Sequence, residues 1–303
     1  MKHLLGLRDV SAGEIETILN EAFRMKREVL LGNKKTGDLN GKSVVTLFYE
    51  NSTRTRLSFE LASKYLGATA ANITASGSSV AKGETLIDTA KTIRQMAADA
   101  VIIRHPSSGA PHLVAEHVDT AVINAGDGMH EHPTQALLDL MTIQEKKGTL
   151  HGLKVAIVGD VKHSRVARSN IYGLKKMGAE VVLGGPSTLM PAEIEQMGVK
   201  AYYDVDRAVE GADVIMGLRI QLERQKKGSF PTVREYHKYF GINDARLRKA
   251  APDVIVMHPG PVNRGVELSA DVIDGVKSVI EQQVTNGVCV RMAVLNLLIG
   301  DKR

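Results

Sequence analysis

A short run of hydroxyl and guanidinium side chains, Ser52-Thr53-Arg54-Thr55-Arg56, follows the apolar stretch Val44–Tyr49. The apolar stretch is typical of a buried strand, and Leu57–Ala62 continues as a helix with Ser52 or Thr53 as its N-cap. A helix N-terminus offers free N–H groups and a partial positive charge, so arginines there are unfavourable unless an anion binds. The run therefore predicts a phosphate or carboxylate site. The alternative is a surface turn with solvated arginines.

Polar side chains also follow the other strands that the sequence predicts. Ligands of open α/β sheets bind beyond the carboxyl ends of the strands, and the planar fork of arginine suits carboxylates and phosphates. Several arginines at such positions predict a substrate set with several negative charges. An exposed strand-end charge and a helix-capping histidine are the simpler alternatives for Arg104 and His132. The residues are Arg104, His132, Gln135, Arg165, Arg219, Gln221 and the turn His258–Pro261.

Apolar, β-rich runs alternate with helical patterns along the whole chain, which predicts an α/β protein with two doubly wound domains. Each domain is expected to hold a parallel sheet flanked by helices. A polar stretch at 146–152 marks the boundary, giving domains 1–148 and 149–284, and the C-terminal helix, about 285–303, packs back on the first. The expected strands are 44–49, 68–73, 100–103, 121–124, 153–158, 180–183, 212–217 and 254–257, and the main helices are 11–30, 53–62, 85–98, 133–147, 163–177 and 278–300.

Composition excludes several classes of protein. The 303 residues carry a net charge of +5 without a basic block, and only 4% are aromatic, so no nucleic-acid partner is expected. The start of the chain lacks the apolar core of a signal peptide and no apolar run could span a membrane, which predicts a cytoplasmic protein without a membrane partner. Cys289 is the only cysteine, so an intrachain disulfide is excluded.

Motifs for common cofactors are missing. The chain has no G-x-x-x-x-G-K-[ST] phosphate loop, and Gly159–His163 does not fit G-x-G-x-x-G. It has no H-E-x-x-H, and its ten histidines do not cluster as ligands, so no metal is expected. A nucleophilic serine in a G-x-S-x-G turn is also absent from the sequence. By elimination, the sequence predicts an anion site that uses arginines and needs no cofactor.

In combination, the motifs resemble those of the aspartate/ornithine carbamoyltransferase family over essentially the full length and in the expected order. Ser52–Arg56 resembles the carbamoyl-phosphate signature, and His132-Pro133-Thr134-Gln135 resembles the second motif. His163–Asn170, Arg219–Arg224 and His258–Pro261 are similar to the aspartate-specific members, since ornithine-specific members would carry a cysteine-containing motif in place of the last.

The sequence departs from the family pattern at two places. Met129-His130-Glu131 precedes His132 where smaller or amide residues are expected, and this could alter the charge beside His132. Leu218 stands where methionine is common. Neither departure replaces a residue that the resemblance assigns to the chemistry.

The resemblance implies a reaction. The carbamoyl group of carbamoyl phosphate passes to the α-amine of L-aspartate, giving N-carbamoyl-L-aspartate and phosphate in de novo pyrimidine (UMP) biosynthesis. By resemblance, one group of residues binds carbamoyl phosphate: side chains and helix-start N–H groups hold the phosphate, and donors and acceptors hold the carbamoyl group. This group is Ser52, Thr53, Arg54, Thr55, Arg104, His132, Gln135, Gly260 and Pro261, and its catalytic members are Arg54, Thr55, Arg104 and His132, together with Lys82.

The resemblance assigns a second group to aspartate. Arg165 and Arg219 clamp the two carboxylates, with Gln221 nearby. Ser78 and Lys82 come from the neighbouring subunit, so the working unit is a homotrimer with shared active sites, although the residues alone make Lys82 a solvated loop lysine. The sequence leaves open whether a separate regulatory chain binds.

Two alternatives compete with this function. A transferase for another amine, such as ornithine, would need an acidic group for a cationic side chain, whereas Arg165 and Arg219 offer cations. A protein that binds anions without catalysis is disfavoured because the phosphate turn, the oxyanion donors and the carboxylate clamp are all intact.

We also expect Glu50, beside the phosphate turn, to pair with Arg165 or Arg219.

Overall fold

The computed structural model describes residues 1–74, 83–220 and 232–301. The chain forms two compact units: unit 1 comprises Met1–Met141 and Thr285–Arg303, and unit 2 comprises Thr142–Val284. Within the described ranges, every helix is too short or too polar to cross a membrane.

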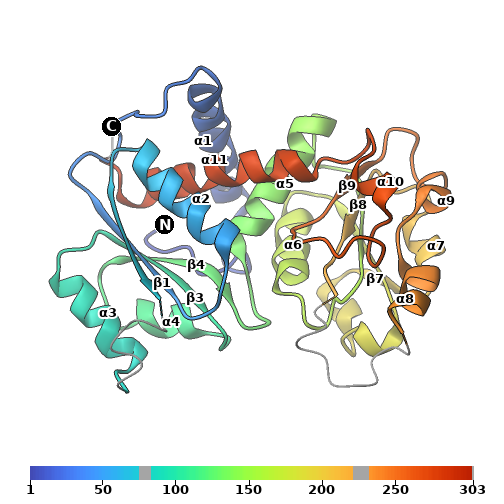
Figure 1. The fold of residues 1–303 in the computed structure, drawn as a ribbon, viewed down its shortest axis with the longest axis horizontal. Helices are drawn as coiled ribbons and strands as arrows, with labels where there is room; N and C mark the ends of the chain where they lie inside the picture. Colours follow the sequence, from blue (N-terminus) through green and yellow to red (C-terminus); the bar gives the residue numbers. More distant parts are fainter. Residues whose placement is uncertain (75–82, 221–231, 302–303) are drawn as a thin grey trace. The chain divides into compact units, whose positions relative to one another are not determined.

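Unit 1 contains a four-stranded parallel sheet with the strand order β2-β1-β3-β4. Helices α1, α2 and α11 lie on one side of this sheet, and α3 and α4 lie on the other (Figure 1). The elements are α1 (Ala12–Leu30), β1 (Ser43–Phe48), α2 (Thr53–Tyr65), β2 (Thr69–Thr74), α3 (Leu86–Gln95), β3 (Ala100–His105), α4 (Ala110–Ala115), β4 (Ala121–Asp127), α5 (Pro133–Lys147, which continues into unit 2) and α11 (Ile280–Ile299, which begins in unit 2).

Burial of both sheet faces explains the apolar sequences of β3 and β4. Strands covered by helices on both sides read as continuous apolar runs rather than alternating ones. Val101 and Ile103 of β3 are fully buried and pack with Ile93 of α3 and Val114 of α4 in one cluster. Helix α1 begins at a capping box in which Ser11 and Glu14 bond to each other's backbone N–H groups, as the sequence predicts.

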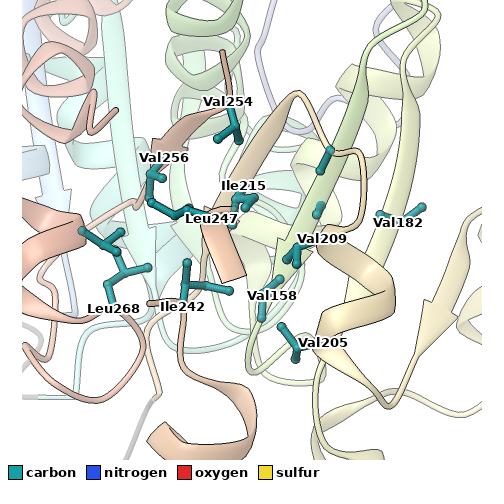
Figure 2. Packing of buried hydrophobic residues seen from close by; sticks show 13 residues of the cluster. Val158, Val182, Val205, Val209, Ile215, Ile242, Leu247, Val254, Val256 and Leu268 are labelled. Carbon is teal, nitrogen blue, oxygen red and sulfur yellow. The ribbon is translucent and has the colours of Figure 1, made fainter. Parts of the chain in front are cut away.

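Unit 2 contains a five-stranded parallel sheet with the order β7-β6-β5-β8-β9. One sheet face is covered by α7, α9 and α10, and its packing is shown in Figure 2, where Val205 and Val209 of α7 and Leu247 of α9 meet Val158 and Ile215. The elements are β5 (Lys154–Val158), α6 (Arg165–Lys176), β6 (Glu180–Gly184), the 3-10 turns η3 (Ser187–Leu189) and η4 (Ile194–Met197), β7 (Lys200–Tyr202), α7 (Val205–Val209), β8 (Val214–Gly217), α8 (Val233–Phe240), α9 (Asp244–Leu247), β9 (Ile255–Met257) and α10 (Ala270–Ile273).

The predicted fold class is confirmed: two parallel sheets flanked by helices, with the C-terminal helix packed on unit 1. The sequence missed α4, β7, α7, α8, α9 and α10. Apart from the eight-residue α8, these elements have only three to six residues, too few to display a period. Several predicted ends were wrong by two residues or more; α3, for example, ends at Gln95 rather than at 98. β4 runs to Asp127 rather than stopping at 124, and α6 begins at Arg165 rather than 163 because the side chain of Ser164 caps it.

Polar contacts fix α11 on unit 1. The guanidinium of Arg291 lies 5.0 Å from the ring centroid of Phe59 in α2. Burial lowers the pKa of Arg291 to about 10, although the negative charge of Asp139 acts to raise it. The buried ammonium of Lys26 in α1 donates to Oδ1 of Asn286 at 2.8 Å. A buried cation depends on such acceptors, because each one lost leaves a desolvation cost behind.

We predict that Asn286→Ala lowers the free energy of unfolding by about 2 kcal/mol, since hydrogen bonds to charged groups contribute about 1.5–3 kcal/mol. Urea unfolding followed by circular dichroism measures the change. Thr285→Ala, at an exposed position in the same helix, serves as the control and should change stability little. Equal stabilities of the two variants would contradict the anchoring role of the Lys26–Asn286 contact.

Candidate active site

Both sheets reverse their strand order once, between β1 and β3 in unit 1 and between β5 and β8 in unit 2. In open parallel sheets the loops leaving such neighbouring strands diverge to opposite faces and open a binding crevice at the carboxyl ends. The residues that the sequence singled out follow these strands in each unit. In each unit, these residues therefore follow the strands between which a parallel sheet favours ligand binding.

The start of α2 is an uncapped helix N-terminus. Ser52 is the N-cap residue, but its side chain makes no capping hydrogen bond in the described structure, whereas Ser11 caps α1 and Thr85 caps α3. The first turn of α2 holds no acidic residue, and it carries the exposed Arg54 and the buried Thr55. These N–H groups, hydroxyls and guanidinium together suit a phosphate.

Arg104 lies beside this helix start because β1 and β3 are neighbours. The register pairs Phe48 with Arg104, and the N–H of Tyr49 donates to the carbonyl of Arg104 at 2.8 Å. Its Nη1 donates to the carbonyl of Ala125 at 3.2 Å, and its Nε lies 3.4 Å from Oε2 of Glu50. These contacts from both neighbouring strands orient the guanidinium. Glu50 thus has an ion-pair neighbour inside unit 1, and its pairing with unit 2 stays a prediction.

His132 and Gln135 come from the start of α5. His132 is 4% exposed, and its carbonyl accepts from the N–H of Gln135 at 3.0 Å. Nε2 of Gln135 donates to Oδ1 of the fully buried Asp139 at 2.9 Å. This bond fixes the amide with its nitrogen toward Asp139, so that the side-chain oxygen is the group left to accept a hydrogen bond from a ligand. Asp139 is a positioning residue that the sequence did not suggest.

Glu131, one of the departures from the family pattern, is 1% exposed. Its Oε2 accepts from the N–H of Leu7 at 2.7 Å, and its Oε1 accepts from the N–H of Arg8 at 3.2 Å. The carboxylate thus ties the N-terminal segment to the residue next to His132. These N–H donors stabilise the negative charge of Glu131, and the bonds hold the segment before His132 in place.

In unit 2, the end of β5 prepares the position of Arg165. Gly159 has φ +135°, and a Cβ there would lie 2.9 Å from the carbonyl of Leu218, so glycine lets the ends of β5 and β8 approach. The buried Asp160 accepts from the backbone N–H of His163 at 3.1 Å and lies 2.9 Å from its Nδ1. Arg165 follows as the first residue of α6 and is 6% exposed.

Arg219 directly follows Leu218 at the end of β8, and the segment after it is fixed by Glu267. This carboxylate is 2% exposed and accepts from the N–H of Ile220 at 2.7 Å, the N–H of Asn263 at 2.9 Å and Nδ2 of Asn263 at 2.7 Å. Burial raises the pKa of Glu267, and the hydrogen bonds from Ile220 and Asn263 oppose that rise. This role could not be predicted from the sequence, because Glu267 lies 47 residues from Ile220 in the chain.

The turn after β9 is fixed through His258, whose Nδ1 accepts from the N–H of Gly260 at 2.9 Å. Gly260 has φ +64° and precedes Pro261. The N–H of His258 donates to Oε1 of Gln283 at 3.0 Å. Ser78, Lys82 and Gln221, which the sequence also assigned to the site, lie outside the described residues.

The prediction that the histidines do not cluster was wrong for one pair. His112 of α4 and His130 lie beside Asp127, and one ligand-capable atom from each of the three falls within 4.8 Å of the others. The fold creates this group by packing α4 against the end of β4. None of the three residues was assigned to the anion site from the sequence.

Comparisons with known proteins identify the family. Residues 2–145 match the family described as aspartate/ornithine carbamoyltransferase, carbamoyl-P binding domain, and residues 151–298 match its Asp/Orn binding domain. The chain belongs to the aspartate/ornithine carbamoyltransferase family. A relative in Ruminiclostridium cellulolyticum, named aspartate carbamoyltransferase catalytic subunit, is 69% identical over 98% of this chain and 95% of the relative. A protein of the same name in Acetivibrio thermocellus is 65% identical with the same coverage.

Solved structures of the family share the fold but differ in their second substrate. Ornithine carbamoyltransferase from Pyrococcus furiosus is similar with a TM-score of 0.89 and 35% identity, over 100% of this chain and 98% of that one. Aspartate transcarbamoylase from Trypanosoma cruzi, in complex with carbamoyl phosphate and aspartate, has a TM-score of 0.89 and 32% identity, over 99% and 97%. The fold alone therefore does not separate the two amines.

We predict that Glu267→Gln changes stability in a pH-dependent way. Because the folded-state pKa of Glu267 is raised, its contribution to stability is present below the ordinary value near 4.5 and is lost as pH rises through the folded pKa. Glutamine does not ionise. The free energy of unfolding of the wild type, minus that of the variant, should therefore fall as pH rises from about 4.5 to about 7.5.

Asp206→Asn is the control, and its effect on stability should change with pH in the opposite direction. Lys249 and Arg246 lower the pKa of Asp206, so its contribution to stability is present above the ordinary value and is lost as pH falls. Urea unfolding at a series of pH values measures both variants. A difference for Glu267→Gln that does not vary with pH would contradict a raised pKa at the buried Glu267.

Proposed function

We propose that this chain transfers the carbamoyl group from carbamoyl phosphate to the α-amine of L-aspartate, forming N-carbamoyl-L-aspartate and phosphate in de novo pyrimidine biosynthesis. The observation that carries the choice of amine is the placement of Arg165 and Arg219 after β5 and β8, at the switch point of unit 2. Two guanidinium groups there suit a dicarboxylate, because each binds a carboxylate through two parallel hydrogen bonds.

Unit 1 supplies the carbamoyl-phosphate half in this proposal. The uncapped start of α2 binds the phosphate through its N–H groups, Ser52, Thr53 and Arg54. Arg104, held against β4 by its bond to Ala125, bridges the phosphate and the carbamoyl oxygen. The domain description matched by residues 2–145 supports this assignment.

The chemistry requires that charge be stabilised as it develops. An uncharged amine attacks the carbamoyl carbon, negative charge grows on the carbonyl oxygen, and phosphate leaves. Arg104, Thr55 and His132 donate to that oxygen, and preorganised donors of this kind typically contribute most of the rate enhancement. Gln135, whose amide orientation Asp139 fixes, accepts from the carbamoyl amino group, as do the carbonyls of Gly260–Pro261 in this proposal. The leaving phosphate takes the proton of the amine.

Ornithine is the competing amine, and it would require a carboxylate for its side-chain ammonium. Two buried carboxylates lie close to the segments that carry the arginines, but Asp160 bonds to His163, and Glu267 bonds to Ile220 and Asn263. Both are buried, whereas the arginines follow the strands directly. The names of the relatives at 65–69% identity favour aspartate as well.

We further propose that residues 1–148, with the C-terminal helix of about 285–303, form the carbamoyl-phosphate-binding domain, and that residues 149–284 bind aspartate. The matches of residues 2–145 and 151–298 to the two family domains support this division. If it is correct, a fragment covering the second part should, where it folds, bind aspartate analogues and not carbamoyl phosphate.

The assembly is also part of the proposal. We infer a cytoplasmic homotrimer in which Ser78 and Lys82 of one chain serve the active site of the next, with Gln221 beside the bound aspartate. The resemblance of the motifs supports this inference, and a separate regulatory chain is compatible with it. Sedimentation of the active protein should give the mass of three chains. An active single chain would contradict shared sites.

We predict transfer from labelled carbamoyl phosphate to L-aspartate and none to L-ornithine. The two amines are offered at equal concentration, and the products are separated and counted. Transfer to ornithine would mean that Arg165 and Arg219 were misassigned while the phosphate half was correct. Transfer to neither amine would contradict the proposed reaction.

We predict that Arg54→Ala lowers kcat at least about a thousandfold, since it removes a donor at a site of developing charge. Arg56→Ala removes the same charge from the same exposed helix start and is the matched control. Steady-state rates with saturating aspartate measure both variants. Similar losses in both would show that only the general positive field matters, and near-normal rates in Arg54→Ala would remove this residue from the mechanism.

A further inference from the structure

Three metal-ligating side chains converge in unit 1 outside the residues assigned to the reaction. His112 lies on α4, Asp127 is the last residue of β4, and His130 follows in the segment that leads to α5. One ligand-capable atom from each residue lies within 4.8 Å of the other two. Two imidazoles and one carboxylate are a ligand set that transition metals favour.

The carboxylate of this cluster is held rigidly. Asp127 is fully buried, and its Oδ1 accepts from Nδ2 of Asn124 at 2.7 Å and from the N–H of Glu131 at 3.1 Å. Its Oδ2 accepts from the N–H of Gly109 at 2.7 Å and lies 3.0 Å from Nδ1 of His130. A metal that replaces the proton between Oδ2 and His130 would keep the other three hydrogen bonds.

The second histidine provides an independent sign of a ligand. Nδ1 of His112 is buried and has no hydrogen-bond partner among the described residues. Burying an unpaired polar nitrogen is costly, and its lone pair is a common metal ligand. The His112 ring faces His130 edge-on, with the ring centroids 5.3 Å apart. Both rings therefore meet at the same carboxylate.

We propose that His112, Asp127 and His130 bind one divalent transition-metal ion of borderline softness, such as Zn²⁺. Ligand atoms around a tetrahedral zinc lie roughly 3.4 Å apart, so modest rotations of the two imidazoles toward the fixed carboxylate suffice. Three protein ligands leave one position for water. Mg²⁺ and Ca²⁺ are disfavoured because they take oxygen ligands.

The bound ion would join α4 to the segment between β4 and α5. His130 stands two residues before His132, so the ion would restrain the segment that carries this donor. Because imidazole binds a metal only in its unprotonated form, metal binding should strengthen as pH rises. The metal proposal does not rest on the proposed transfer reaction.

The test uses Co²⁺, whose visible absorption reports tetrahedral coordination. A tag-free chain is stripped with a chelator, dialysed and titrated with Co²⁺ alone, and Zn²⁺ is then added as competitor. We expect one Co²⁺ per chain, displaced by Zn²⁺. His112→Gln and His130→Gln should each weaken binding at least tenfold, since even changes beyond the first ligands cost about 10–100-fold.

His117→Gln is the matched control, because His117 is exposed just beyond the C-terminus of α4 and its ring contacts the carbonyl of Leu113. It should bind Co²⁺ as the wild type does. Absence of stoichiometric binding by the wild type would overturn the proposal. So would unchanged affinity in His112→Gln, which alters a residue that makes no described side-chain hydrogen bond and should fold normally by circular dichroism.

Discussion

Parallel pairing of neighbouring strands is the constraint on which the rest of the structure depends. Because β1, β3 and β4 are adjacent and run in one direction, their carboxyl ends meet at one edge of the sheet. The start of α2, Arg104 and the segment leading to His132 are thereby brought together although the chain separates them widely. Unit 2 repeats the arrangement with β5, β8 and β9, which deliver Arg165, Arg219 and the turn at His258.

Buried carboxylates position the polar groups that these strand ends carry. Asp139 orients the amide of Gln135, Glu131 ties the neighbour of His132 to the N-terminal segment, and Glu267 joins the residues after Arg219 to the turn that follows β9. Each acid is buried and accepts from N–H donors, so its charge is compensated locally. Arg54, at the start of α2, is exposed.

Local patterns in the sequence predicted what depends on neighbours along the chain. The strand–turn–helix at Ser52, the proline at the start of α5 and the alternation of strands and helices required no knowledge of the fold. Family motifs added the functional roles. Short elements such as β7 and α9 were missed because they have no period to detect.

Partners distant in the chain could not be predicted from one sequence. The contact between Ile220 and Glu267 spans 47 residues, and the cluster of His112, Asp127 and His130 exists only because α4 packs beside β4. In each case the residue type was visible, but its neighbour was decided by sheet order. The raised pKa of Glu267 likewise follows from burial, which tertiary packing determines.

The central claim is that phosphate recognition belongs to unit 1 and carboxylate recognition to unit 2. Calorimetric titration of carbamoyl phosphate, without aspartate, into the wild type, Arg54→Ala and Arg219→Ala tests it most directly. The account predicts that Arg54→Ala loses most of its affinity for carbamoyl phosphate and that Arg219→Ala keeps it. Loss of affinity in Arg219→Ala, or its retention in Arg54→Ala, would contradict the division of the two anions between the two sheets.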